Sequence, residues 1–324
     1  MTERDYSRPR VVSSKCLEFE ACRYNGVMIP DPFVRKLIPL ADFLPVCPEM
    51  EIGLGVPRDP IRVVSEKGGL RLIQPSTGLD CTEKMLSFCR SFLDSLGEVD
   101  GFLLKYRSPS CGIKDVKIHP PREDAPALGK GAGFFGAAVL ERFPLLPAED
   151  EGRLNNFTIR EHFLTRLFTL ASFRRVAASG EMGALVDFHS DNKLLLMAFH
   201  QGELKVMGKL VANPEKSKPA RVIEEYRAHL LRALARPPRF TSAINVLMHA
   251  LGYFKKGLSA REKAFFLDQL ELYRAGKVPL SAPVSVVNAW IARFEQEYLA
   301  RQTFFAPYPL ELVEITDSGK GRKY

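Results

Sequence analysis

Cysteines follow three short apolar segments in the first half of the chain. Cys16 comes after RVVSSK, Cys47 after FLPV and Cys111 after FLLKYRSPS. Each segment predicts a buried strand, so each cysteine is expected just past a strand's carboxyl end. In an open parallel sheet these ends share one edge, where such sheets bind ligands. The three thiols are therefore predicted to converge.

Three converging thiolates suit a soft metal centre, either zinc or an iron–sulfur cluster. Structural zinc usually takes four ligands from paired CxxC motifs, and this sequence contains no CxxC. A cubane cluster held by three cysteines leaves one iron without a protein ligand, which is the open position that catalysis requires. The pattern favours the cluster, and chance placement of the cysteines is the remaining alternative.

The other three cysteines have different settings. Cys89 lies inside the helical pattern TEKMLSFCRSFL and is expected to be a buried core thiol. Cys22 and Cys81 lie in expected loops, and their roles stay open. The start, MTERDYSRPR, has no apolar core, and no apolar run approaches the roughly 20 residues that span a bilayer. We therefore expect a cytoplasmic protein without a membrane partner, in which six cysteines do not form disulfides.

Alternating strand and helix patterns in the first half predict an α/β domain with a mostly parallel, Rossmann-like sheet. Expected strands lie in 10–17, 41–49, 61–66, 70–75 and 99–107, and expected helices in 82–96 and 132–143. The segment 144–156 is rich in proline and acid and has no period, which indicates a linker. The first domain is therefore predicted to span residues 1–150.

Helical periodicity dominates the second half and predicts an all-α domain over residues 157–324. The expected helices lie in 157–179, 191–213, 220–236, 240–254, 259–276 and 284–302. Ser259 and Glu262 have the spacing of a capping box at a helix start. The last eight residues, DSGKGRKY, are expected to be disordered.

The charge distribution separates the two halves. Residues 1–150 carry 20 Lys and Arg against 21 Asp and Glu, whereas residues 151–324 carry 26 against 17. A basic half joined to a neutral one suggests that the second holds a polyanion, of which nucleic acid is the commonest in cytoplasm. A basic surface kept for solubility is the alternative.

At several places the first half resembles the thiouracil desulfidase family. The motifs, in order, are Ser14-Lys15-Cys16-Leu17, Cys22-Arg23-Tyr24-Asn25-Gly26, Val46-Cys47-Pro48-Glu49, Val56-Pro57-Arg58, Gln74-Pro75-Ser76-Thr77-Gly78 and Ser108-Pro109-Ser110-Cys111-Gly112. The first motif departs from the family's usual small residue before the cysteine and Leu-Gly after it, and Asn25 stands where Asp is common. The resemblance implies a [4Fe–4S] cluster bound by Cys16, Cys47 and Cys111.

The second half resembles the YbgA-like helical domain. The similar segments are 191–198, 210–212, 302–303 and 307–309, and Glu151-Gly152-Arg153-Leu154 resembles the joint found in two-domain fusions. Such fusions are thought to remove sulfur from 4-thiouridine in tRNA. The resemblance therefore implies a desulfidase that hydrolyses the thiocarbonyl of 4-thiouridine to uridine, with tRNA as its partner.

This chemistry requires a Lewis acid for sulfur and a base for water. An open iron would bind the substrate sulfur, and Glu49, two residues beyond Cys47, is the predicted base. Ser108 is predicted to orient the water or to contact the pyrimidine, although a turn-forming serine is nearly as common at such a place. Thr77 and Gly78 are candidate contacts to the base or its ribose, although Ser-Thr-Gly is also ordinary turn chemistry. No nicotinamide or flavin is expected.

Basic residues of the helical half form a candidate phosphate-contacting set. The predicted contacts are Lys193, Lys205, Lys209, Arg227 and Arg232. A Gly-x-Gly-x-x-Gly match over 131–136 has no strand running directly into it, so we expect a loop and helix start near the site and not a dinucleotide fingerprint.

Two alternative functions remain open from the sequence. One is a desulfidase of free thiouracil or of thiouridine nucleotides. The other is a non-enzymatic RNA-binding protein whose cysteines hold a structural metal.

Overall fold

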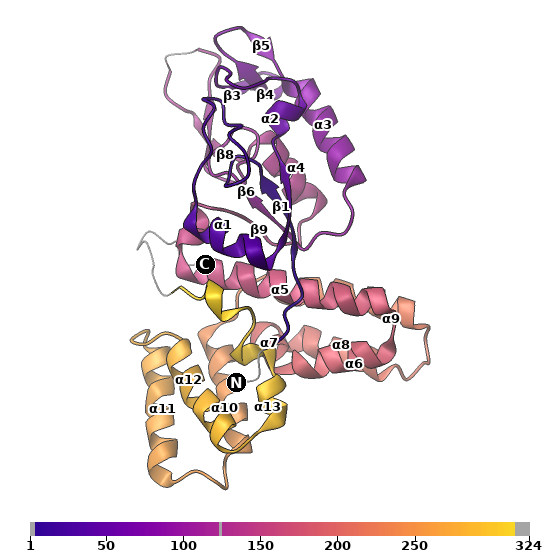
Figure 1. Ribbon diagram of the computed structural model, residues 1–324, viewed down its shortest axis with the longest axis vertical. Coiled ribbons are helices and arrows are strands. Elements are labelled where there is room, and N and C mark those ends of the chain that lie inside the picture. The colour runs from indigo at the N-terminus through magenta and orange to yellow at the C-terminus, as the bar shows by residue number, and fades with distance from the viewer. Residues whose placement is uncertain (1–3, 123–124, 315–324) are drawn as a thin grey trace. The chain divides into compact units, whose positions relative to one another are not determined.

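The computed structural model describes residues 4–122 and 125–314 and divides into two compact units (Figure 1). The sheet unit comprises Arg8–Ala171 and the chain from Leu310 on, and the helical unit comprises Met1–Ser7 and Ser172–Pro309. The chain therefore passes between the units three times, once within helix α5 (Phe157–Ser179). The domain boundaries predicted from the sequence, 1–150 and 157–324, stay predictions. The expected disordered tail, 317–324, lies outside the described residues.

A parallel sheet carries the expected strands of the first half. Its order is β2 (Asp42–Val46), β1 (Arg10–Ser14), β6 (Gly101–Leu104) and β9 (Ala148–Asp150), and every pairing is parallel. Val11 and Val12 are both fully buried although they face opposite sides of β1, which is typical of a parallel sheet covered on both faces. The predicted α/β class with a mostly parallel sheet is confirmed.

A second sheet contains two strands that the sequence analysis did not separate from the first. Its order is β5 (Leu79–Asp80), β4 (Gly69–Gln74), β3 (Arg62–Glu66), β7 (Val116–His119) and β8 (Gly129–Gly131). Only β3 and β7 pair in parallel, and the other neighbours are antiparallel. The turn between β3 and β4 is only two residues long, Lys67 and Gly68, so these strands form a hairpin instead of extending the parallel sheet.

Helices cover the sheets and complete a shared core. They are α1 (Pro32–Leu37), α2 (Pro48–Glu51), α3 (Thr82–Ser95) and α4 (Phe134–Arg142). In α3, the four-residue spacing of Met85, Cys89 and Leu93 places all three against the strands. Cys89 is 2% exposed and belongs to this core, as predicted.

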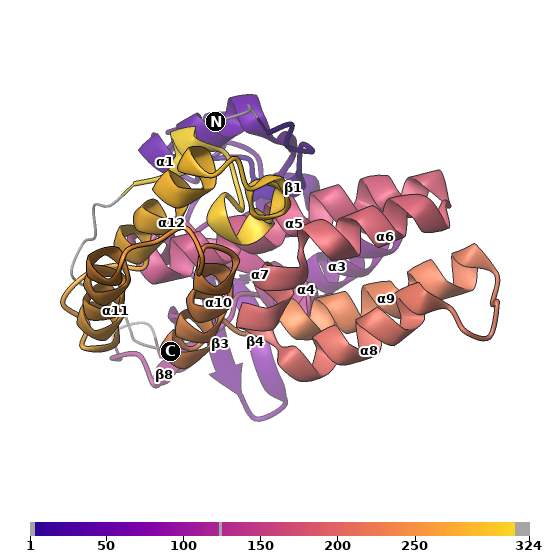
Figure 2. The ribbon, with the colours of Figure 1, turned by 90° about the horizontal axis from the view of Figure 1, so that it is seen from below.

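The helical unit is all-α, also as predicted. Its helices are α6 (Met182–Asp191), α7 (Lys193–Phe199), α8 (Gln201–Ala212), α9 (Pro219–Leu234), α10 (Phe240–Tyr253), α11 (Ala260–Arg274), α12 (Ser281–Arg293) and α13 (Glu297–Arg301). Ser259 and Glu262 form the predicted capping box of α11. Helices α8 and α9 lie side by side as a hairpin (Figure 2).

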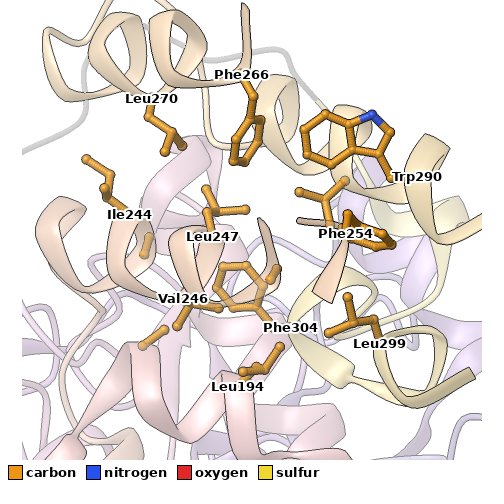
Figure 3. Close-up of a cluster of buried hydrophobic side chains, with 14 of the residues drawn as sticks. Leu194, Ile244, Val246, Leu247, Phe254, Phe266, Leu270, Trp290, Leu299 and Phe304 are labelled. Carbon is orange, nitrogen blue, oxygen red and sulfur yellow. The ribbon is translucent and has the colours of Figure 1, made fainter. Parts of the chain in front are cut away.

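Aromatic and aliphatic side chains pack together in a core of the helical unit (Figure 3). The Trp290 ring of α12 lies 5.0 Å from the Phe266 ring of α11 and 5.7 Å from that of Phe254, centroid to centroid. Leu247 of α10 is fully buried in the same cluster. Burial of these large apolar side chains holds α10, α11 and α12 together.

Three sequence expectations need correction. The helix expected over 191–213 is divided at Asn192 and at His200, where His200 is extended and its ring accepts a hydrogen bond from the Glu203 amide as the N-cap of α8. The helix expected over 284–302 is interrupted after Arg293, where Glu295 is left-handed. The segment expected as a linker, 144–156, supplies β9 to the parallel sheet. Among the described helices, none is both long and apolar enough to cross a membrane.

Candidate functional site

The parallel sheet brings three cysteines to one edge. Strands β2, β1 and β6 are neighbours in the sheet, and Cys47, Cys16 and Cys111 follow their respective carboxyl ends. Cys47 and Cys111 are buried, and Cys16 is half-buried. The predicted convergence agrees with this order, because the carboxyl ends of parallel neighbours share an edge.

Cys22 joins this group, which the sequence analysis left open. Its side chain is 1% exposed, and its carbonyl oxygen lies 3.9 Å from the Cys47 Sγ. Burial, and then the nearby thiols of Cys47 and Cys16, raise the pKa of Cys22 to about 12. The four cysteine side chains therefore share one buried neighbourhood.

Burial has the same effect on the thiols of Cys16 and Cys111. Burial raises the pKa of Cys16 to about 12, the Cys47 thiol adds to the rise, and the Lys105 ammonium opposes it. Burial also raises the pKa of Cys111, against a hydrogen bond from the Ser14 hydroxyl that lowers it. Without a cation these thiols stay protonated at neutral pH, so thiolate ligation requires the positive charge of a metal.

The donor set suits a soft metal centre, because it consists of buried sulfur atoms. Within residues 4–122 and 125–314, no three His, Cys, Asp or Glu side chains have the spacing of ligands to a single ion. A polynuclear cluster does not require that spacing, because each thiolate binds a different metal atom. The chemistry of these sulfur donors fits such a cluster, and ligation by Cys16, Cys47 and Cys111 stays a prediction.

The carboxylate of Glu49 lies at the centre of a buried hydrogen-bond network. Helix α2 begins directly after Cys47, with Pro48 at its first position, and this places Glu49 beside the cysteines. Its Oε2 accepts hydrogen bonds from Arg58 Nε at 2.9 Å and Nη2 at 2.7 Å, and its Oε1 accepts one from Ser110 Oγ at 2.7 Å. The carboxylate is therefore fixed by three donors.

Arg58 also fixes the segment that carries Cys22. Its Nη1 donates to the carbonyl oxygens of Cys22 at 3.1 Å and Gly55 at 2.8 Å, and its side chain is 4% exposed. One buried guanidinium therefore ties the Cys22 segment to Glu49, and through Glu49 to the Cys111 loop.

Ser108 organises the turn before Cys111. Its Oγ accepts hydrogen bonds from the backbone amides of Cys111 at 3.1 Å and Ser110 at 3.3 Å, and it lies 2.9 Å from the Ser110 Oγ. Because the Ser110 hydroxyl donates to Glu49, the Ser108 hydroxyl can donate to Ser110. The structure thus shows the turn-forming serine that the sequence analysis weighed, and the predicted catalytic role of Ser108 stays a prediction.

The glycine motif over 131–136 packs against this cysteine loop. The amides of Phe134, Phe135 and Gly136 donate to the carbonyl oxygens of Pro109 and Ser110, at 2.9 to 3.1 Å. A Cβ on Gly136 would lie 2.3 Å from the Gly112 oxygen. The start of α4 therefore binds protein backbone, so these three amides are not available for a phosphate. The expected helix start near the site is confirmed, but the expectation that no strand runs into the motif is wrong, because β8 ends at Gly131 and α4 begins at Phe134.

Thr77 and Gly78 lie in the exposed turn between β4 and β5. Thr77 Oγ1 donates to Gln74 Oε1 at 2.8 Å, and Gly78 is left-handed with φ +69°. The turn is tied to the site by Ser76, whose Oγ donates to Asp59 Oδ2 at 2.8 Å, next to Arg58. Contact of Thr77 and Gly78 with a substrate stays a prediction.

The predicted phosphate contacts lie on α7, α8 and α9. Lys193, Lys205 and Lys209 are exposed, whereas Arg227 is half-buried. Arg232 Nε lies 3.3 Å from the Glu203 carboxylate, which also accepts from His229. Burial raises the pKa of Glu203, but His229 and Arg232 together outweigh burial and hold that pKa below its usual value. The charge of Arg232 is therefore already partly paired with Glu203.

Comparison with known families agrees with this arrangement. Residues 11–151 match the family model described as 2-thiouracil desulfurase, and residues 193–309 match DUF1722, a family of proteins of unknown function. The uncharacterized protein YbgA of Escherichia coli (strain K12) is 30% identical over 158 residues, which are 48% of this chain and 93% of that protein. The chain belongs to the 2-thiouracil desulfurase family and carries a DUF1722 domain.

Two further similarities fall within the same comparisons. The uncharacterized protein YbbK of Bacillus subtilis (strain 168) is 31% identical over 109 residues, covering 32% of this chain and 72% of that protein. A solved structure, the [4Fe-4S]-dependent thiouracil desulfidase TudS, is 26% identical and covers 45% of this chain and 93% of its own, with a TM-score of 0.36. The family resemblances predicted from the sequence are confirmed, and the chain is a desulfidase of the thiouracil type.

The sequence analysis missed Arg58 and Ser110 as members of the site. Both stood within quoted motifs, Val56-Pro57-Arg58 and Ser108 to Gly112. The sequence could have indicated them by residue type and position, because Arg58 lies nine residues after Glu49 and Ser110 directly precedes Cys111. What the sequence did not give was their partner, because Ser110 and Glu49 are 61 residues apart.

Proposed function

We propose that the protein is an iron–sulfur desulfidase that converts 4-thiouridine in tRNA to uridine and releases sulfide. The observation that carries the proposal is the placement of Cys16, Cys47 and Cys111 beyond three adjacent parallel strands, beside the buried carboxylate of Glu49. Membership of the thiouracil desulfurase family supports the reaction class.

Cys16, Cys47 and Cys111 would hold a [4Fe–4S] cluster. Bound there, the cluster would supply Lewis acidity toward the sulfur of the substrate. The overall reaction exchanges the thiocarbonyl sulfur for the oxygen of one water molecule, so the carbon becomes a carbonyl and hydrogen sulfide leaves. No electron is gained or lost.

Glu49 would receive the proton of the attacking water. Its Oε1 already accepts the Ser110 hydroxyl hydrogen, and that hydroxyl lies 2.9 Å from the Ser108 hydroxyl. A proton can therefore reach Glu49 directly or by way of Ser110. Arg58 holds the carboxylate in a fixed orientation, which a base requires before it accepts the proton.

The charge of the helical unit supports tRNA as the substrate. Residues 193–239, which contain α7, α8 and α9, carry ten Lys and Arg against four Asp and Glu. Such an excess binds phosphate without reading sequence, so the thiolated base would be selected at the sheet edge after leaving its stack.

The first experiment measures iron, zinc and acid-labile sulfide in protein purified without oxygen. About four irons and four sulfides per chain are expected, with loss in Cys111→Ala and retention in Cys89→Ala, the buried core control. One zinc, or no metal, contradicts the proposal. Loaded protein is then incubated with tRNA that contains 4-thiouridine, and nucleosides are quantified by mass spectrometry.

A parallel assay with free 2-thiouracil and free 4-thiouridine tests the alternative substrates. Removal of residues 157–324 is unsuitable, because it takes residues 157–171 of α5 and residues 310–314 from the sheet unit. The double variant Lys205→Ala/Lys209→Ala is used instead. We expect it to reduce turnover of tRNA and not of the free compounds; efficient turnover of free compounds with none of tRNA contradicts the tRNA proposal.

A further inference from the structure

Two loops beside the cysteines each carry an arginine stacked on its neighbouring tyrosine. The Arg23 guanidinium carbon lies 5.0 Å from the Tyr24 ring centroid, and that of Arg107 lies 4.6 Å from the Tyr106 ring centroid. Arg23 directly follows Cys22, and Arg107 lies four residues before Cys111. The two pairs thus border the cysteine neighbourhood from the β1 side and from the β6 side.

Both arginines are available to a partner. Within the described part of the chain, neither has an ion pair with a carboxylate, in contrast to Arg35, Arg58 and Arg153 of the same unit. Arg107 is exposed, Arg23 is half-buried and Tyr24 is 37% exposed. Cationic groups beside the site therefore stay uncompensated.

The backbone at Arg107 adds an independent observation. Its φ is +57°, in the left-handed region that a branched or long side chain rarely adopts. Tyr106 is fixed from the other side, because its amide donates to Glu151 Oε2 at 2.8 Å. Left-handed residues that are not glycine concentrate at functional sites, where the surrounding structure holds them.

We infer that the Arg23–Tyr24 and Arg107–Tyr106 pairs form an RNA-binding rim around the site, which holds the nucleotides that flank the thiolated base. An arginine that stacks through its face keeps its edge N–H groups free for phosphate, and an exposed tyrosine offers a stacking surface to an unstacked base. This inference rests on the proposed function, and it assigns part of tRNA recognition to the sheet unit.

The test compares tRNA with free 4-thiouridine for Arg23→Ala, Arg107→Ala and the double variant. For each single variant we expect kcat/KM on tRNA to fall about tenfold more than kcat/KM on the free nucleoside. The salt dependence of tRNA binding should also weaken, by about one unit of log–log slope per arginine that contacts phosphate. Arg23→Lys and Arg107→Lys keep the charge, so they should restore the salt dependence of tRNA binding. They should restore only part of the tRNA affinity, because lysine lacks the planar guanidinium that stacks on tyrosine.

Arg142→Ala is the matched control. Arg142 also lies over an aromatic ring, that of Phe143 at 5.9 Å, but it pairs with Asp94 at the far end of α4 from the cysteine loop. It should leave both substrates and the iron content unchanged.

Each other outcome is decisive. Equal losses on both substrates, or a loss of iron, would show that the arginines only support the fold and would overturn the inference. If the wild type desulfurates tRNA and the arginine variants keep its tRNA affinity and its salt dependence, the inference is overturned and the proposed function is not. A wild type that acts on free 4-thiouridine and never on tRNA would overturn the proposed substrate as well.

Discussion

Glu49 and Arg58 form a buried ion pair beside the cysteine cluster, with their side chains 12% and 4% exposed and two N–H groups of Arg58 on one carboxylate oxygen. Burial removes both charges from water, which costs free energy. The attraction between the two charges offsets that desolvation cost only while both partners are present. The same guanidinium holds the Cys22 carbonyl, so this contact links local order near the cysteines to the orientation of the predicted base.

Arg58→Gln should therefore destabilise the metal-free protein strongly. Leaving a buried charge without its partner costs about 3–5 kcal/mol, and urea unfolding of metal-free protein would measure it. Arg142→Gln is the control, because Arg142 is 61% exposed and its partner Asp94 is 71% exposed, and we expect less than about 1 kcal/mol from it. Similar losses in the two variants would contradict the role assigned to burial.

Ser110→Ala and Ser108→Ala should separate two roles within one loop. Ser110→Ala removes the donor to Glu49, so kcat should fall about 10- to 100-fold while iron and sulfide per chain stay at the wild-type level. Ser108→Ala removes the acceptor of two amides, one of them that of Cys111, so the metal content should fall first. If Ser108→Ala keeps its metal and loses only turnover, Ser108 acts on the substrate as the sequence analysis predicted.

The convergence of the cysteines was predictable from the sequence, whereas the hydrogen bonds by which Arg58, Ser108 and Ser110 hold the surrounding segments were not. Strand periodicity and the common edge of a parallel sheet suffice to group Cys16, Cys47 and Cys111. Apolar periodicity does not say which strands pair, so β3 and β4 were expected in the parallel sheet and lie in another. It also cannot detect β9, since Ala-Glu-Asp has no strand pattern.

Side-chain partners were the other missing element. The ion pair of Arg58 depends on the segment between α2 and β3, and the bond from Ser110 to Glu49 depends on the registers of β6 and β2 against β1. A glycine motif resembling a nucleotide loop was correctly placed near the site, but its actual partner, the backbone of the cysteine loop, follows only from the packed structure.

Gly136→Ala should displace the Cys111 loop. The added Cβ would meet backbone oxygens of Gly112 at 2.3 Å and Cys111 at 2.8 Å, and backbone cannot move aside as a flexible side chain can. We expect a lower melting temperature and reduced iron uptake during anaerobic reconstitution. Gly183→Ala, in α6 with nothing within 4 Å of its Cβ position, should instead be neutral or stabilise by about 0.5–1 kcal/mol. Full iron uptake by Gly136→Ala would show that the loop tolerates the contact.

Asp150 should make stability depend on pH. It is fully buried at the end of β9, and its Oδ1 accepts from the Arg153 amide at 2.8 Å, whereas its Oδ2 has no hydrogen-bond partner among the described residues. Burial raises the pKa of Asp150 from 3.8 to about 7. A raised carboxyl pKa means that the folded state holds its proton more tightly, so this contribution is complete below pH 3.8 and is lost as pH rises through about 7.

Asp150→Asn removes that titration, because the amide stays neutral and keeps an oxygen for the Arg153 amide. The free energy of unfolding of the variant should rise relative to wild type between pH 5 and pH 8, by up to about 3 kcal/mol. Urea unfolding of both proteins at several pH values measures the difference, and Asp94→Asn, whose carboxylate is 71% exposed, is the control. A constant difference between Asp150→Asn and wild type across this range would mean that Asp150 is already ionised at pH 5, and that its unpartnered oxygen is reached by water.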